Sequence, residues 1–171
     1  MISSRVAVAV HVLAYMAWKR SEAVTSERIA ASVNTNPVVV RRIVGALRNA
    51  GMVTVQPGVG GGATLAREPA DITLLDVYRA VEDREELFSL HPQEPSHSCS
   101  IGGNIRDVLR PIFCSAHRAV EGVLAGVTIA DVGRQVIERA GGECCGETLE
   151  MPEAQYAEDE ASTFAQADGV A

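Results

Sequence analysis

The sequence predicts a mainly α-helical protein with one small β-hairpin, and three observations support this fold class. Two short amphipathic stretches flank the turn Asn34-Thr35-Asn36. Apolar and polar residues then alternate before a glycine-rich tip at 57–62. A later stretch keeps helical apolar spacing over residues 105–127. Helix, turn, helix and hairpin in this order indicate a winged helix-turn-helix, followed here by a long helix.

The helix after the turn has clear boundaries. Asn36 is a preferred N-cap, Pro37 suits the first helical position, and Gly51 can supply a left-handed stop. Its apolar residues recur at i, i+3, i+4 and i+7 and form the buried face: Val40, Ile43, Val44 and Leu47. The opposite face carries arginines and small residues but no acid. Such a face suits the major groove of DNA, where guanidinium groups reach guanine edges or phosphates.

The elements on either side follow from similar signals. An apolar helix from residue 3 or 4 to about residue 20 should be buried on several sides. Thr25 can cap the next helix, whose inward residues are Ile29, Ala30 and Val33. The hairpin is expected from about residue 52 to residue 67. Val53 and Val55 alternate with polar residues, which predicts a half-buried strand.

Capping-box spacings predict two later helices, Thr73-x-x-Asp76 and Thr128-x-x-Asp131. The first should end near residue 83, and a short extended piece is expected after it at 87–90. The residues expected to face inward are Leu75, Tyr78 and Val81 or near neighbours in the first helix, and Ile129, Val132, Val136 and Ile137 in the second. Between them, the longest helix opens at Asn104, and Pro111 should kink or break it.

The net charge of −7 is unevenly distributed. Residues 1–70 hold eight basic and three acidic side chains, whereas residues 143–171 hold eight acids and no base. The region that would contact DNA is therefore basic, and local charge matters more for phosphate contact than the total. The apolar run at 6–18 is too short to span a bilayer and no signal-peptide pattern precedes it, so we expect a cytoplasmic protein that does not engage a membrane.

Taken together, these patterns predict four regions: a winged helix-turn-helix at 1–83, a linker loop at 84–103, dimerisation helices at 104–140 and an acidic, disordered tail at 141–171. A helix as long and apolar as the one from residue 104 needs a partner surface. The simplest partner is the same helix of a second copy, and packing on the N-terminal domain alone is the alternative.

Several segments together resemble one family. SRVAVAVHVLAYMA, TSERIAASVNTNPVVVRRIVGALRNAGMV, GVGGGATLAREPADITLLDVYRAVE and the long later helix are similar to the Rrf-two family of bacterial winged-helix transcriptional regulators, over about residues 1–138. The resemblance implies a homodimeric transcription factor whose partner is double-stranded DNA. It places the start of the recognition helix at 38–42, the wing around 58–62 and the dimer contact on the helix from residue 104.

Two sets of site residues follow. The expected DNA-binding residues are Arg5, Thr25, Asn36, Val38, Val39, Arg41, Arg42, Arg48, Gly60 and Gly61. The expected dimerisation residues are Ile105, Val108, Leu109, Ile112, Phe113, Ala116, Val120 and Leu124. Family members often carry an arginine at the wing tip, where this chain has Pro57, so specific readout should depend more on the helix than on the wing.

The loop before the long helix departs from the members of the family that bind an iron–sulfur cluster. Those members carry three closely spaced cysteines there, whereas HPQEPSHSCSIGG contains Cys99 alone. The segment is more similar to the branch without a cluster, so we expect no cofactor. His91 and His97 share the loop with Cys99, but their spacing matches no established metal motif, and we predict no metal site.

The other cysteines leave sensing open. Cys114 has His117 at i+3 and Arg118 at i+4, and cationic neighbours favour a reactive thiolate. A partly buried, inert thiol is the alternative. Cys144 and Cys145 are adjacent in glycine-rich chain and could both turn toward one thiophilic ion or oxidant, or belong to an inert tail.

The sequence therefore predicts a dimeric DNA-binding transcriptional regulator, a repressor, with cysteines that respond to redox or thiophilic signals. The alternative is a cytosolic thiol- or metal-sensing protein, or a protein-binding adaptor, on a winged-helix scaffold. No catalytic constellation or nucleotide-binding loop is present in the sequence, so we do not expect an enzyme.

Overall fold

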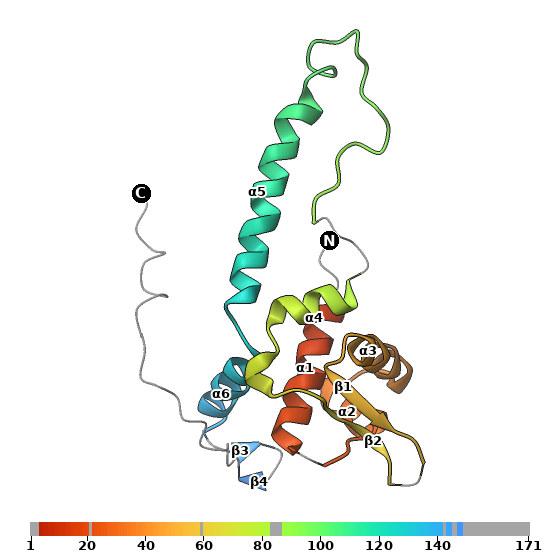
Figure 1. Cartoon of the computed structure of the whole chain (residues 1–171), viewed down its shortest axis with the longest axis vertical. Helices are drawn as coiled ribbons and strands as arrows, with labels where there is room; N and C mark the ends of the chain where they lie inside the picture. The colour runs from red at the N-terminus through yellow and green to blue at the C-terminus, as the bar shows by residue number, and fades with distance from the viewer. Residues whose placement is uncertain are drawn as a thin grey trace.

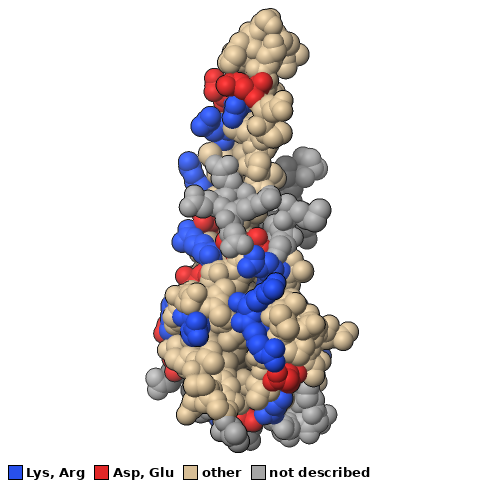
Figure 2. Space-filling view, turned by 90° about the vertical axis from the view of Figure 1, so that its right-hand side faces the viewer, with Lys and Arg blue, Asp and Glu red and all other residues tan. Residues whose placement is uncertain are grey.

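The computed structural model describes residues 4–20, 22–58, 60–82, 87–141, 143–144 and 147–148. A globular part contains most of the elements, and one long helix projects from it (Figures 1 and 2). The elements are α1 (Ser4–Lys19), α2 (Ser26–Val33), α3 (Pro37–Asn49), β1 (Val53–Gln56), β2 (Gly62–Leu65), the short 3-10 helix η1 (Pro69–Asp71), α4 (Leu74–Val81), α5 (Ile105–Ala125), α6 (Ile129–Arg139), β3 (Glu143–Cys144) and β4 (Glu147–Thr148).

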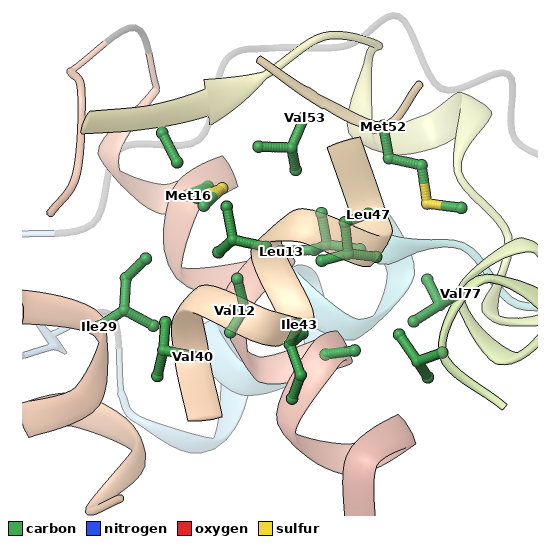
Figure 3. Packing of buried hydrophobic residues seen from close by; sticks show 14 of the residues in the cluster. Val12, Leu13, Met16, Ile29, Val40, Ile43, Leu47, Met52, Val53 and Val77 are labelled. Carbon is green, nitrogen blue, oxygen red and sulfur yellow. The ribbon is translucent and has the colours of Figure 1, made fainter. Parts of the chain in front are cut away.

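The core is built around α1, which packs against α3, α4 and α6. Leu13 and Met16 of α1 are fully buried and meet Leu47 of α3 and Val53 of β1 in one cluster (Figure 3). The expected inner face of α3 is confirmed, because Val40, Ile43, Val44 and Leu47 are all buried. A nearly all-apolar α1 is thus explained by neighbours on several sides.

Side-chain caps fix the limits of α2 and α3. The Thr25 hydroxyl accepts a hydrogen bond from the Arg28 N–H at 3.3 Å, and the Asn36 side chain accepts one from the Val38 N–H at 2.8 Å. Asn34 ends α2 in the left-handed conformation with φ 56°, and Gly51 follows α3 with φ 73°. The tight turn between the two helices is therefore locally encoded.

The wing is an antiparallel hairpin in which Val53 pairs with Leu65 and Gln56 pairs with Gly62. Val24 forms an antiparallel bridge beside β2, in which its N–H donates to the Ala63 carbonyl oxygen and its carbonyl oxygen accepts from the Ala63 N–H, both at 2.9 Å. The expected alternation was wrong for Val55, which is 43% exposed. Val53 belongs to the core cluster, whereas Val55, one residue from the end of β1, does not, although it pairs with buried Ala63.

The capping boxes predicted at Thr73 and Thr128 are both present. In α4, Val77 rather than Leu75 is fully buried, together with Tyr78 and Val81. In α6, Ile129 is buried, but Val136, expected to face inward, is 48% exposed. The expected inward faces are therefore confirmed at Tyr78, Val81 and Ile129, and the prediction was wrong for Val136.

The long helix and the segment before it also differ in part from expectation. α5 continues through Pro111 without a break. Residues 87–90 form no strand; instead the Phe88 ring stacks on Phe113 of α5, with ring centroids 5.2 Å apart. None of the residues of α5 is fully buried within the chain.

The last described elements return to the globular part. α6 packs on α1 and supplies Ile129 to the main core, and the Ile129 N–H donates to the Ile72 carbonyl oxygen at 2.9 Å. Within this chain α6 is thus joined to the N-terminal core, although the sequence prediction grouped it with the dimerisation helix. The short strands β3 and β4 pair antiparallel, so the prediction of disorder at 141–171 was wrong for these residues, and apart from them and Gly141 the predicted tail lies outside the described residues. In the described part of the chain, no helix has the length and apolar character needed to cross a membrane.

Candidate nucleic-acid interface

The outer face of α3 presents two valines and three arginines. Val38 is 48% exposed and Val39 is 39% exposed, at the second and third positions of the helix. Arg41, Arg42 and Arg48 are all exposed, and α3 itself contains no acidic residue. The arginine guanidinium groups can donate hydrogen bonds to phosphates and guanine edges, and the valine methyl groups can contact thymine methyl groups.

Basic side chains gather around this helix. Figure 2, which looks onto the side of the molecule that carries α3, shows Lys and Arg side chains forming a column down the globular part, with few acidic groups beside it. The column agrees with the positive net charge of residues 1–70, which contain eight basic and three acidic side chains. A localised positive field of this kind attracts a polyanion despite the negative total.

One acidic residue of the neighbouring helix reaches α3, and the sequence analysis did not predict this contact. Glu27 of α2 accepts a hydrogen bond from the Arg41 guanidinium at 2.5 Å. Its own backbone N–H and the Arg41 side chain hold the pKa of Glu27 below its usual range. A second exposed pair, Glu22 with Arg28, lies at the start of the same helix, also at 2.5 Å. The face that looked acid-free on α3 alone thus carries an acid from its neighbour.

Two residues expected to contact DNA are already engaged in capping. Thr25 and Asn36 are exposed, but their side-chain oxygens accept from the first turns of α2 and α3. Contact between these two side-chain oxygens and DNA would therefore compete with the caps. Arg5 is exposed at the start of α1.

The wing tip has the backbone freedom that the glycines suggested. Gly60 has φ 79° and open space where a side chain would be. Gly61 is different, because a Cβ there would lie 2.2 Å from the Gln56 carbonyl oxygen. Gly61 is therefore required by the close turn, whereas Gly60 leaves room for an approaching backbone or phosphate.

The exposed apolar surface of α5 contains part of the predicted dimerisation set. Val108 and Ile112 are each 56% exposed, and the other expected residues are half-buried: Ile105, Leu109, Phe113, Ala116, Val120 and Leu124. Val123 of α5, which is 67% exposed, was not in the expected dimerisation set, and neither was Ile101, which is 73% exposed in the turn before the helix. Exposed apolar residues repeated along one helix are typical of an interface.

The described thiols are exposed and unpaired with each other. Cys99 and Cys114 are free cysteines. Backbone N–H groups of Gly102 and Ile101 hold the pKa of the Cys99 thiol below its usual value. The Cys144 side chain and the whole of Cys145 lie outside the described residues, so the hypothesis about adjacent thiols concerns a part of the chain that the structure does not describe.

A polar cluster joins α4 to the base of α5. Arg79 donates to Glu121 at 2.8 Å, and the His117 ring nitrogen lies 3.7 Å from the same carboxylate. Burial, with the charges of Glu82 and Glu121, raises the pKa of Tyr78. These contacts link α4 to the C-terminal part of α5.

Comparison with known proteins identifies the relatives of this chain. A family model described as "Rrf2: Iron-dependent Transcriptional regulator" matches residues 2–135. The "Putative HTH-type transcriptional regulator YwnA" of Bacillus subtilis (strain 168) is 48% identical over 132 residues, which cover 77% of this chain and 96% of that protein.

Solved structures are similar over the same region. The "Crystal structure of a putative DNA binding protein" has 42% sequence identity and a TM-score of 0.61, covering 75% of this chain and 98% of that one. CymR (YrzC), the global cysteine regulator of B. subtilis, has 26% identity and a TM-score of 0.59, covering 79% of this chain and 97% of that one. The winged helix-turn-helix fold is thereby confirmed, and the relatives are transcriptional regulators rather than enzymes.

The family description mentions iron, but the donors present here do not fit an iron–sulfur cluster. Such clusters are held by several cysteine thiolates, and the loop 91–103 supplies Cys99 alone. His97 in that loop faces Glu94 at 3.6 Å. Over the residues that the structure describes, no group of three His, Cys, Asp or Glu side chains could hold a metal ion.

The match over 134 of 171 residues, the identity to YwnA and the wing-bearing helix-turn-helix agree on one assignment. The chain belongs to the Rrf2 (Rrf-two) family of transcriptional regulators.

Proposed function

We propose that this protein is a homodimeric, sequence-specific DNA-binding repressor. The observation that carries the proposal is the outer face of α3, where Arg41 and Arg42 stand exposed beside Val38 and Val39. A recognition helix of this composition can contact phosphates and base edges in the major groove. The proposed DNA-binding set is the one predicted from the sequence, with Arg41, Arg42 and Arg48 as the principal charged contacts.

Dimerisation is proposed through α5. The helix carries exposed Val108, Ile112 and Val123, and burying them against the same helix of a second copy removes this apolar surface from water. A symmetric dimer then presents two α3 helices to an operator with two-fold symmetry. A dimer seated on a promoter excludes other proteins from it, which is the basis for proposing repression in the cytoplasm.

The signal is proposed to act on thiols. Cys99 is exposed, and its low pKa favours the reactive thiolate. An oxidant or a thiophilic ion that modifies it would act in the loop that leads into α5. Cys114, Cys144 and Cys145 are secondary candidates for the same role.

The test is DNA binding as a function of salt. DNA fragments enriched by the protein from fragmented genomic DNA provide the operator, and fluorescence anisotropy measures affinity between low and physiological salt. We expect Arg42→Ala to weaken binding to all duplexes and to flatten the slope of log K against log salt by about one unit, the value for one lost phosphate contact. Arg139→Ala on α6 is the matched control and should leave the slope unchanged.

The alternative function would give a different result. A thiol-sensing protein or adaptor on this scaffold would show no preference for any duplex and no effect of either arginine. If Arg41→Ala and Arg42→Ala both leave affinity and salt slope intact, α3 is not the recognition helix.

A further inference from the structure

One contact on the recognition face is not explained by the fold or by simple charge attraction to DNA. Arg41 of α3 is paired with Glu27 of α2, at 2.5 Å between Nη2 and Oε1. No ion pair or hydrogen bond is found for the Arg42 and Arg48 side chains within the described residues. The three arginines of α3 are therefore not equivalent.

The pair contributes little to folding. The Arg41 and Glu27 side chains are 57% and 60% exposed, and exposed ion pairs add little to stability. The two helices are already joined by buried Ile29 of α2 and Val40 and Ile43 of α3. A negative charge beside a DNA-binding arginine also costs affinity, because it lies near the phosphates that the arginine would meet.

The geometry nevertheless leaves Arg41 competent to bind a base. A guanidinium has five N–H donors, and Glu27 accepts from Nη2 alone in this structure. Reading guanine O6 and N7 takes two parallel donors. A guanidinium fixed on one side by a carboxylate is held in one orientation, so less side-chain freedom is lost when the base is bound.

We infer that Glu27 is a positioning residue for base recognition, which holds the Arg41 guanidinium for bidentate contact with a guanine and lowers affinity for duplexes that lack it. This inference rests on the proposed DNA-binding function and assigns different roles to the three arginines of α3. Arg41 reads a base under the control of Glu27, and Arg42 and Arg48 supply charge that does not depend on sequence.

The experiment compares Glu27→Gln with wild type on three kinds of duplex: the operator, a set of operators with one base pair changed at a time, and a random duplex. Gln keeps the length of the side chain and removes its charge. We expect Glu27→Gln to bind the random duplex at least as tightly as wild type. The ratio of operator to random affinity should fall about 2- to 12-fold, the value of immobilising one long side chain.

The position of the loss distinguishes positioning from a structural role. The weakened preference should be confined to one guanine in each half-site, the one whose preference Arg41→Ala also removes. Combining Glu27→Gln with Arg41→Ala should add nothing to the loss caused by Arg41→Ala alone. A structural role would change binding to every duplex by the same factor.

Glu22→Gln is the matched control, because Glu22 pairs with Arg28 on the same helix at the same 2.5 Å. It should leave the ratio and the base preferences unchanged. Glu27→Ala, which removes the acceptor altogether, should lower the ratio at least as much as Glu27→Gln, with the same helix content by circular dichroism.

The inference is overturned if Glu27→Gln keeps the wild-type ratio, or if Glu22→Gln lowers the ratio equally. Failure of the proposed function has a different signature, since the wild-type protein itself would then fail to distinguish any enriched fragment from random duplex.

Discussion

The exposed surface of α5 gives a quantitative prediction for the dimer. Ile112 is 56% exposed within one protomer. Burying a whole isoleucine side chain is worth about 2–3 kcal/mol, so burying the exposed part contributes about 1–1.5 kcal/mol per copy. Alanine retains only the β-carbon of this surface. Ile112→Ala should therefore weaken the dimer by about 2 kcal/mol over its two copies, which is a rise of about 30-fold in the dissociation constant.

Sedimentation equilibrium over a wide range of protein concentration measures this constant directly. Val55→Ala is the control, because Val55 is 43% exposed but lies in the wing (Figure 1). The control should leave the constant unchanged, and Val123→Ala should raise it, since Val123 is 67% exposed on α5. A wild-type protein that stays monomeric throughout, or equal effects of Ile112→Ala and Val55→Ala, would refute the assignment of α5 as the dimer helix.

Three further results are expected. Leu13→Ala should lower the free energy of unfolding by about 2–5 kcal/mol in urea titrations, because Leu13 is fully buried in the core. Partial burial raises the pKa of Asp131, but hydrogen bonds from Thr128 and the charge and hydrogen bond of Arg134 together outweigh it and leave that pKa lowered. The ionised Asp131 carboxylate therefore stabilises the folded state at pH values above the ordinary carboxyl pKa, and this stabilisation is lost as the pH falls through the lowered pKa. Asp131→Asn should flatten the acid limb of a profile of unfolding free energy against pH. At neutral pH, Cys99 should react with iodoacetamide faster than free cysteine by mass spectrometry, and Gly102→Ala, which disturbs the turn that donates to the thiol, should slow it.

The helix-turn-helix could be predicted largely from the sequence. Thr25 and Asn36 cap helices that begin at the next residue, and Gly51 adopts a left-handed conformation just after α3 ends, so each signal involves only neighbouring residues. The inner face of α3 follows from apolar spacing along one helix. Caps, turns and helical spacing do not depend on how the helices pack together, which is why the element order and the buried face of α3 were predictable.

Single inward positions of the short helices were less predictable. Val77 is buried where Leu75 was expected, and Val136 is exposed where it was expected to be inside. An eight-residue helix such as α4 has few apolar positions, so its pattern allows more than one inward face. The choice between those faces is made by the helices that it meets.

By itself, the sequence determined three things: the basic, acid-free character of α3, the capped ends of α2 and α3, and the family to which the chain belongs. Each of these depends on residues that are close together in the chain. Only the tertiary structure brought Glu27 to Arg41, Phe88 to Phe113 and α6 back onto α1. These contacts join segments whose separation in the chain carries no local signal, and they form only when the shared core fixes one packing of all the helices.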